Sequence, residues 1–235
     1  LSAITVVSAN DAWAVGSYYD GSFSITLTEH WDGTAWNIIS SPNPSPSFNT
    51  LSSITAVSAT DVWAVGYSTS NTPLIEHWDG QGWNIAASPV SAGELTAVTS
   101  VPGTNQVWAV GSNNVSATLI ELWDGHRWSA VSSPNPGVVA NSLQGIIAVS
   151  QNDIWAVGVY RLGGYTPQIA LVEHWDGKSW TTISTPSRGS DDNLHGVTGI
   201  PGAQGLWTVG RADGQSFIES YSYCLLYTSP SPRDR

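Results

Sequence analysis

Residues 51–87 read LSSITAVSATDVWAVGYSTSNTPLIEHWDGQGWNIAA, and this stretch decides the fold. Its apolar and β-branched residues gather in short runs that are separated by turn residues, a pattern typical of strands. Asp79-Gly80 between two such runs is a strong hairpin signal, because glycine accepts the positive φ that tight turns need. The stretch therefore predicts four short strands, at Leu51–Ser58, Val62–Tyr67, Leu74–Trp78 and Trp83–Ala87.

The same pattern recurs with variations along the chain, and its copies start at Leu1, Leu51, Leu95, Leu143 and Leu194. Starts that lie 44 to 51 residues apart, with four apolar runs per copy, are typical of β-propeller blades. We therefore predict an all-β protein, a β-propeller fragment of four four-stranded blades and the inner half of a fifth. The predicted blades are residues 1–50, 51–94, 95–142, 143–193 and, in part, 194–223. We expect the complete propeller to contain at least five blades, and about six to eight.

The tryptophans follow the repeat. All 13 fall on three positions of it, one in the second, one in the third and one in the fourth predicted strand. Side chains placed so regularly are predicted to be packing elements. A single blade buries too little apolar surface to offset the entropy lost when its chain is ordered, so neighbouring blades must cover its faces.

The C-terminal residues limit the extent of the repeat, and the charge of the chain limits the class of partner. Cys224–Arg235 matches no part of the repeat and resembles a translated sequencing adapter, so we expect a non-native or disordered tail at 224–235. The chain has 18 acidic and 7 basic residues, a balance that disfavours nucleic acid and anionic membranes as partners. No apolar run approaches the ~18 residues of a membrane-spanning helix, and no membrane insertion is expected. The oligomeric state is left open.

The repeat has a recognisable likeness. The D-x-W-A-V-G strand and the D-G-x-x-W hairpin resemble the bacterial propeller families with kelch-like or Asp-box (sialidase-type) repeats, and the repeats of photosystem assembly-factor propellers. The likeness covers residues 1–223. Two features depart from it: Asp and Gly are adjacent in the hairpin, as in Asp79-Gly80, and the double glycine of kelch repeats is absent. The upstream Gly-His of WD40 repeats is also absent, which argues against that family.

Several acidic and histidine residues recur once per blade. The repeated glutamates are Glu29, Glu76, Glu121, Glu173 and Glu219, and the repeated histidines are His30, His77 and His174. A catalytic or metal site needs a few residues at one place, whereas copies spread over separate blades serve the scaffold. We therefore predict structural glutamates and histidines, no metal site, no cofactor and no catalytic residues.

The segments that differ between repeats are the better functional candidates. They connect the second strand to the third, and the fourth strand to the next blade, and both sets emerge on the same face of a propeller. Variable loops on a rigid scaffold commonly carry binding residues. Side chains suited to stack on a sugar or a peptide are predicted there, namely Tyr18, Tyr19, Tyr160, Arg161 and Tyr165.

These features favour a non-catalytic binding or scaffold propeller that presents its variable loops to a glycan or protein ligand, and that is secreted or displayed on a bacterial cell surface. One alternative is a propeller-type glycosidase or lyase whose catalytic residues lie partly in blades missing from this sequence. The candidate carboxylates within the sequence are Asp20, Asp191, Asp192 and Asp213. Another alternative, an assembly factor for a membrane protein complex, is implied by the resemblance alone.

Overall fold

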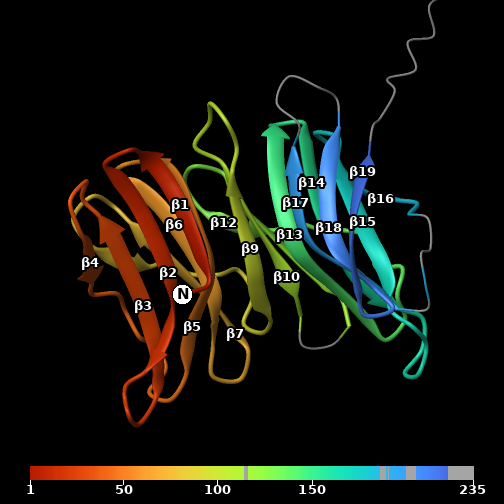
Figure 1. Cartoon of the computed structure of the whole chain (residues 1–235), viewed down its shortest axis with the longest axis horizontal. Coiled ribbons are helices and arrows are strands. Elements are labelled where there is room, and N and C mark those ends of the chain that lie inside the picture. The colour runs from red at the N-terminus through yellow and green to blue at the C-terminus, as the bar shows by residue number, and fades with distance from the viewer. Residues whose placement is uncertain (114–115, 186–188, 190, 200–204, 222–235) are drawn as a thin grey trace, which may run out of the picture.

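The computed structural model describes residues 1–113, 116–185, 189, 191–199 and 205–221 (Figure 1). These residues form 19 strands in five antiparallel sheets, and no helix occurs among them. The described part of the chain accordingly has no helix long and apolar enough to cross a membrane. The tail predicted at 224–235 lies outside the described residues.

Blades 1 to 3 are complete four-stranded sheets. Blade 1 consists of β1 (Ala3–Ser8), β2 (Asp11–Tyr19), β3 (Ser24–Trp31) and β4 (Trp36–Ile39). Blade 2 consists of β5 (Asn49–Ser58), β6 (Asp61–Ser68), β7 (Thr72–Trp78) and β8 (Trp83–Ile85). Blade 3 consists of β9 (Glu94–Ser100), β10 (Val107–Ser112), β11 (Thr118–Trp123) and β12 (Trp128–Ala130).

Blade 4 is also four-stranded, and blade 5 has three described strands. Blade 4 consists of β13 (Ala140–Ser150), β14 (Asp153–Arg161), β15 (Ile169–Trp175) and β16 (Trp180–Ile183). Blade 5 consists of β17 (Asp192–Gly199), β18 (Leu206–Ala212) and β19 (Gln215–Tyr221). Within each sheet the strands follow one another in chain order. The predicted all-β propeller fragment with four four-stranded blades is confirmed. Blade 5 has three described strands, one more than the inner half of a four-stranded blade that was expected.

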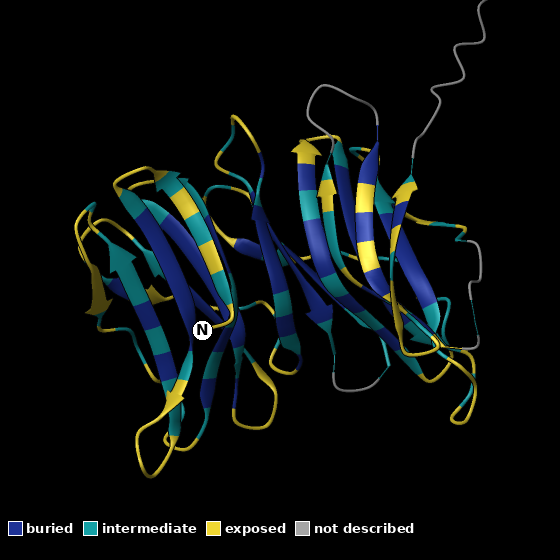
Figure 2. Ribbon diagram, viewed as in Figure 1, coloured by how far each residue is buried: buried dark blue, intermediate teal, exposed yellow. Residues whose placement is uncertain are grey.

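In Figure 1, blades 1 and 2 lie on the left, blade 3 in the middle, and blades 4 and 5 on the right. The first strands of successive blades pack beside one another, β5 against β9 and β9 against β13. Buried residues therefore lie between the sheets, and exposed ones lie in the loops and on the outward faces of β1 and β18 (Figure 2). A stack of sheets explains why the central strands have no polar face.

The glycine of the W-A-V-G motif is required by close packing of the backbone. A Cβ built on Gly66 would collide with the carbonyl oxygen of Thr50 on the neighbouring first strand. The register between the first two strands of blade 2 shifts at this point, between Leu51 and Ser53. The same collision would occur at Gly111, Gly158 and Gly210. The repeated glycine is therefore a packing requirement of the blade.

Tryptophans form the contacts between neighbouring blades. Trp63 of blade 2 lies 4.7 Å from Trp123 and 5.3 Å from Trp128 of blade 3, measured between ring centroids. Trp13 contacts Trp78 and Trp83 of blade 2 in the same way. The second-strand tryptophans of blades 1, 2 and 3 are almost completely buried. The predicted structural role of the tryptophans is therefore confirmed at the covered junctions between blades.

Buried glutamates accompany these tryptophans. Glu76, Glu121 and Glu173 are completely buried. The hydroxyl of Ser88 in blade 2 donates a 2.8 Å hydrogen bond to Oε1 of Glu121 in blade 3. Burial raises the pKa of Glu121 to about 7, and the Ser88 hydrogen bond opposes that rise. Burial likewise raises the pKa of Glu76 and of Glu173 to about 8. The prediction of structural glutamates is borne out at these three positions.

Candidate functional site

The connectivity of the blades gives the propeller two different faces. The turns between first and second strands and between third and fourth strands share one face, which we term the turn face. The other connections share the opposite face, which we term the loop face: the described parts of 20–23, 40–48, 69–71, 86–93, 113–117, 131–139, 162–168, 184–191 and 213–214. Loops of neighbouring strands touch there, as in the 2.7 Å bond from the Gly93 N–H to the carbonyl of Asn71.

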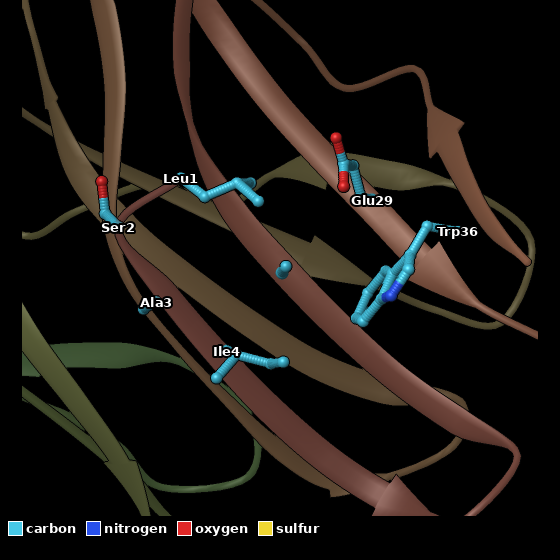
Figure 3. Close-up of a pocket in the computed structure, with 7 residues that line it drawn as sticks. Leu1, Ser2, Ala3, Ile4, Glu29 and Trp36 are labelled. Atoms are coloured by element: carbon cyan, nitrogen blue, oxygen red, sulfur yellow. The ribbon is translucent and has the colours of Figure 1, made fainter.

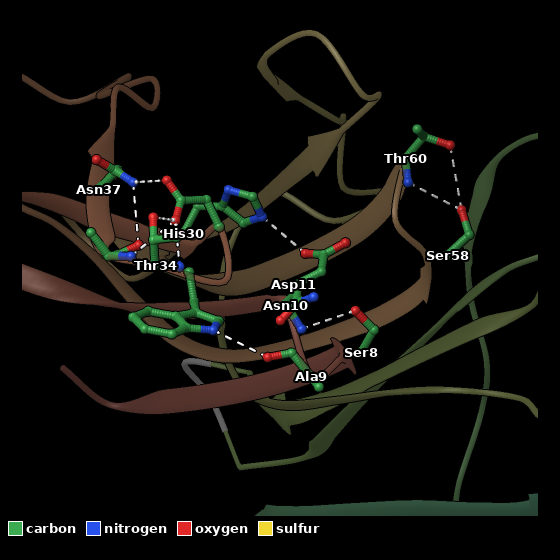
Figure 4. A network of polar contacts seen from close by, with 12 residues as sticks. Ser8, Ala9, Asn10, Asp11, His30, Thr34, Asn37, Ser58 and Thr60 are labelled. Atoms are coloured by element: carbon green, nitrogen blue, oxygen red, sulfur yellow. Dashed lines mark hydrogen bonds and ion pairs between the residues drawn. The ribbon is translucent and has the colours of Figure 1, made fainter.

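The turn face repeats one arrangement of aspartate, histidine and tryptophan. Oδ1 of Asp61 accepts a 2.7 Å hydrogen bond from Nε1 of Trp63 and lies 2.9 Å from Nε2 of His77. The imidazole of His77 stacks on the Trp63 indole at 4.1 Å. In blade 1, Asp11 and His30 make the same contact (Figure 4). Because the arrangement recurs in separate blades, its aspartate, histidine and tryptophan have a structural role.

The hairpin turns of this face are equally regular. Oδ1 of Asp79 accepts hydrogen bonds from the N–H groups of Gln81 and Gly82, and these bonds lower its pKa. Gly80 adopts a φ of 87°, which the predicted Asp-Gly hairpin requires. In Figure 4, Asn37 adds a hydrogen bond to the corresponding aspartate of blade 1. Among the residues that the structure describes, no cluster of three or more His, Cys, Asp or Glu side chains suits a metal ion.

Substitution of Asp61 by alanine tests the structural reading of the turn face. The change leaves the buried indole N–H of Trp63 without its acceptor, so we expect a loss of about 1–3 kcal/mol in the free energy of unfolding. Urea denaturation measures it. Gln106→Ala is the matched control, because Gln106 occupies the same position in blade 3 and its side chain is not bonded to Trp108. If Asp61→Ala and Gln106→Ala lower the free energy of unfolding equally and only slightly, Asp61 does not have this structural role.

On the loop face, a polar pocket lies between blades 4 and 5. Its volume is about 240 Å³, and it is lined by Gln168, Asp191, Asn193, His195, Arg211 and Gly214. Gln168 comes directly before β15 of blade 4, and the other lining residues come from blade 5 or the segment that leads into it. Asn193 and Arg211 face each other in the β17–β18 register.

Hydrogen bonds hold several lining groups in position. The N–H of Gln168 donates a 2.9 Å bond to Oδ1 of Asp191. Nδ1 of His195 donates a 2.5 Å bond to Oε1 of Gln144 on the first strand of blade 4. Arg211 is held by a 3.4 Å bond to the carbonyl of Gly214 and forms no ion pair with a described residue. A carboxylate, a guanidinium, an imidazole and two amides thus converge on one pocket.

An apolar hollow adjoins this pocket. Its volume is about 320 Å³, and it is lined by Leu162, Thr166, Pro167, Gln168, Ile169, Gly189 and Asp192. Gln168 belongs to both linings, so the two hollows are neighbours. Together they offer hydrogen-bonding groups on one side of Gln168 and apolar surface on the other, an arrangement common in sites for small organic ligands.

The tyrosines and the arginine predicted from the sequence all lie at or near the loop face. Tyr160 and Arg161 end β14, and Tyr165 follows in the β14–β15 loop, so these three share blade 4 with the apolar hollow. Tyr18 and Tyr19 end β2 of blade 1. None of these five side chains lines the two hollows, and their role in binding stays a prediction.

The carboxylates considered for an enzyme are only partly brought together. Asp191 lines the polar pocket and Asp192 the apolar hollow. Asp213 lies close by, because its N–H donates a 3.2 Å bond to the carbonyl of Asp191. Asp20 belongs to the β2–β3 loop of blade 1, where it accepts hydrogen bonds from the N–H groups of two neighbours.

Sequence reasoning did not assign His195 and Arg211 to a binding site. Both residues differ in chemical type from the residues at the same positions of the other repeats. His195 follows the leucine that starts the fifth repeat, where the other copies have Ser, Ser, Thr and Gln. Arg211 follows the W-[AT]-V-G motif, where the others have Ser, Tyr, Ser and Val. Basic side chains at positions that are not basic in the other repeats are the departures expected of a site used in one place.

No protein-family model matches the chain, and no curated protein matches its sequence. Solved structures do resemble it. YCF48 bound to D1 peptide matches with a TM-score of 0.58 and 15% identity, over 92% of this chain and 63% of that one. The SapL1 lectin in complex with α-methyl fucoside gives a TM-score of 0.54 and 13% identity, over 92% of this chain and 81% of the lectin.

The six-bladed propeller lectin of Aleuria aurantia, described with its fucose recognition mode, gives a TM-score of 0.56 and 14% identity, over 92% of this chain and 76% of the lectin. This chain thus spans less than two thirds of the YCF48 chain and about three quarters of the Aleuria lectin. Sequence identities of 13% to 15% support a shared fold and nothing beyond it. The blade pattern in the sequence, the five sheets and these likenesses agree, and the chain has a β-propeller fold.

Proposed function

We propose that this chain is a non-catalytic binding propeller that holds a glycan on its loop face, in the polar pocket between blades 4 and 5. The observation that carries the proposal is the convergence of Asp191, Asn193, His195 and Arg211 beside the apolar hollow. A sugar ring has hydroxyls that need directional partners and a C–H face that packs on apolar groups. A volume of about 240 Å³ is of the size that a single sugar residue needs.

Two comparisons support a glycan as the ligand. The SapL1 and Aleuria lectins, which share the fold, are described with a fucoside or with fucose recognition. The proposal transfers only the class of ligand. The specific sugar is decided by how Arg211 and Asp191 divide the hydroxyls between them, because each charged group favours a different hydrogen-bonding pattern.

The proposal is a binding function because Asp191 is the one carboxylate among the described residues that line the polar pocket. Glycoside hydrolysis generally uses two carboxyl groups that flank the scissile bond. Asp192 lines the adjoining apolar hollow. Turnover of a bound glycan would replace this proposal by the glycosidase or lyase alternative.

Arg211→Ala is expected to weaken glycan binding by about 10- to 100-fold, the loss of one hydrogen bond from a charged donor. The measurement is a glycan array followed by titration calorimetry of the best sugar. Tyr165→Ala is the matched control, since Tyr165 is fully exposed and lines neither hollow. Arg211→Ala binding as tightly as the wild type would rule out the pocket as the site.

A peptide ligand is the second candidate, and exposed aromatic side chains on the loop face favour it. Tyr18, Tyr19 and Tyr165 are all exposed there, and the YCF48 structure contains a D1 peptide. A peptide array with the Tyr160→Ala/Tyr165→Ala double variant separates the two candidates. Peptide binding that this double variant abolishes and Arg211→Ala leaves intact would favour the peptide.

We also propose, on the motifs D-x-W-A-V-G and D-G-x-x-W, that the repeat is related to kelch-like or Asp-box propellers of bacteria. Location outside the cell or on its surface fits a surface rich in Ser, Thr and Asn, with no cysteine between residues 1 and 223. A role as an assembly factor for a membrane complex is the remaining alternative. Fractionation of cells that express the protein tests the location.

A further inference from the structure

Gln144 reaches the polar pocket only through His195. It lies on β13, the first strand of blade 4, and Oε1 of its side chain lies 2.5 Å from Nδ1 of His195 on β17. The two residues are 51 positions apart in the chain and occupy the same position of the repeat, directly after its first leucine. His195 lines the pocket, whereas Gln144 does not. Any effect of Gln144 on a ligand must therefore pass through the imidazole.

A glycine lets the two first strands approach each other closely at this point. A Cβ built on Gly145 would lie 3.1 Å from the carbonyl oxygen of His195. That separation is shorter than an ordinary van der Waals contact, so a larger residue would push β17 away from β13. The first three copies of the repeat have Ala3, Ser53 and Ala97 at this position. Gln144 and Gly145 together thus bring an amide within hydrogen-bond distance of the imidazole.

The bond to Gln144 decides which ring nitrogen of His195 carries hydrogen. The amide oxygen Oε1 can only accept, so Nδ1 must be the donor. A neutral imidazole has one N–H group, and its other nitrogen is then an acceptor. Nε2 of His195 therefore presents a lone pair, and none of the residues that the structure describes is bonded to it.

The fixed ring sets the hydrogen-bonding character of the pocket. Nε2 of His195 and the carboxylate of Asp191 accept hydrogen bonds, and the guanidinium of Arg211 donates them. A hydroxyl group both donates and accepts, so the hydroxyls of a sugar can satisfy acceptors and donor alike. An ether oxygen can only accept, and it would meet the lone pair of Nε2 without forming a bond. The tautomer of His195 thus selects a donor group of the ligand.

The same repeat position in blade 1 is a serine. Ser2 lines a hollow of about 470 Å³ on a face of blade 1 that no described blade covers, together with Leu1, Ile4, Glu29 and Trp36 among others (Figure 3). Neither an imidazole nor a guanidinium occurs among the described residues that line this hollow. A serine hydroxyl also donates as well as accepts, so it would not fix a tautomer. Among the five copies of the repeat, glutamine and histidine occupy this position in neighbouring blades only at blades 4 and 5.

We infer that Gln144 is a positioning residue of the glycan site, which holds the imidazole of His195 in its Nδ1–H form so that Nε2 accepts a hydrogen bond from a sugar hydroxyl. The inference rests on the proposed glycan function, and it adds that the ligand group at Nε2 is a donor. A ring that is held in advance binds without the entropy cost of ordering it.

Nuclear magnetic resonance of the ligand-free chain at about pH 8.5, where an imidazole is neutral, tests the tautomer. The ring-nitrogen signals of His195 are identified by their loss in His195→Asn. We expect the Nδ1–H form in the wild type and in Gln144→Glu, because a carboxylate also only accepts. Gln144→Lys offers only a donor and is expected to give the Nε2–H form. Gln144→Ala is expected to lose the fixed Nδ1–H form.

Titration calorimetry with the methyl glycosides of fucose, galactose, glucose and mannose measures the effect on binding. Gln144→Ala is expected to weaken binding of the tightest of these about 3- to 10-fold, the loss of one well-placed hydrogen bond. Gln144→Glu is expected to restore binding to within about twofold of the wild type. Ser52→Ala, at the same repeat position in blade 2, is the matched control and is expected to change neither the tautomer nor the binding.

The two measurements separate this inference from the proposed function. Glycan binding by a wild type that has the Nε2–H form overturns the inference and leaves the glycan proposal standing. Weaker binding by Gln144→Ala with an unchanged tautomer also overturns it, because Gln144 would then be a structural residue only, and so does equal binding by Gln144→Ala and the wild type. If the tautomer changes as expected but the wild type binds neither a methyl glycoside nor an array glycan, the glycan proposal fails and this role of Gln144 fails with it.

Discussion

Trp63→Ala lowers the free energy of unfolding by about 3–5 kcal/mol, the cost of removing a buried tryptophan and leaving a cavity behind. The effect is this large because the Trp63 indole is 1% exposed and contacts two tryptophans of blade 3. Urea unfolding followed by circular dichroism gives the change in midpoint, and its slope shows whether the same surface is exposed in both proteins.

Trp207→Ala is the control for this prediction. Trp207 occupies the same position of the repeat in blade 5, but no described blade covers it. Its replacement is expected to cost less than about 1 kcal/mol, as for other exposed positions. If Trp63→Ala and Trp207→Ala destabilise equally, packing between blades is not what stabilises the array, and the tryptophan argument fails.

The free energy of unfolding is expected to fall as the pH rises from about 4.5 to about 8. Burial raises the pKa of Glu76 and Glu173 to about 8 and that of Glu121 to about 7. These carboxyls therefore keep their protons in the folded chain at pH values where the unfolded chain has released them, and the native state binds more protons. Each shift corresponds to several kcal/mol, at about 1.4 kcal/mol per pKa unit.

The buried glutamates and the hairpin aspartates change the free energy of unfolding with pH in opposite directions. Backbone hydrogen bonds lower the pKa of Asp79 and Asp124, so the stability they contribute is lost only as the pH falls below their usual range. Between pH 5 and pH 9 the glutamates dominate. Glu121→Gln keeps a neutral side chain at every pH, and we expect it to flatten the fall and to raise stability at pH 9.

Glu29→Gln, at the same repeat position on the uncovered face of blade 1, is the matched control for the amide substitution and is expected to change the free energy of unfolding less than Glu121→Gln does. Urea midpoints at pH 5, 7 and 9 give the result. A wild-type protein that becomes more stable from pH 5 to pH 9 would contradict the assignment of neutral, buried glutamates.

The blades were predictable because short sequence patterns specify their turns and strands, and these patterns repeat along the chain. Asp79-Gly80 specifies a hairpin, Trp63 and Trp78 recur at fixed spacing, and the repeat of about 48 residues identifies the blade. The strand ends were less accurate. β5 starts two residues before the predicted Leu51, because Asn49 pairs with Ser68, and β8 stops at Ile85.

The polar pocket was not predictable to the same degree, because its walls come from different blades. Gln168 ends a loop of blade 4, whereas His195 and Arg211 belong to two strands of blade 5. Periodicity reports which residues recur, and these three do not. The aromatic residues of the loops were predicted to bind a ligand because their rings can stack on a sugar or a peptide. The position of a pocket depends instead on which loops meet, and the packing of one blade on the next decides that.

The crystal structure of the chain soaked with its best-binding array glycan tests the central claim most directly. The account predicts the sugar in the pocket between blades 4 and 5, with its hydroxyls bonded to Arg211 and Asp191 and its C–H face toward the hollow that contains Ile169. A sugar bound instead on the turn face, or at another junction between blades with this pocket unoccupied, would contradict it.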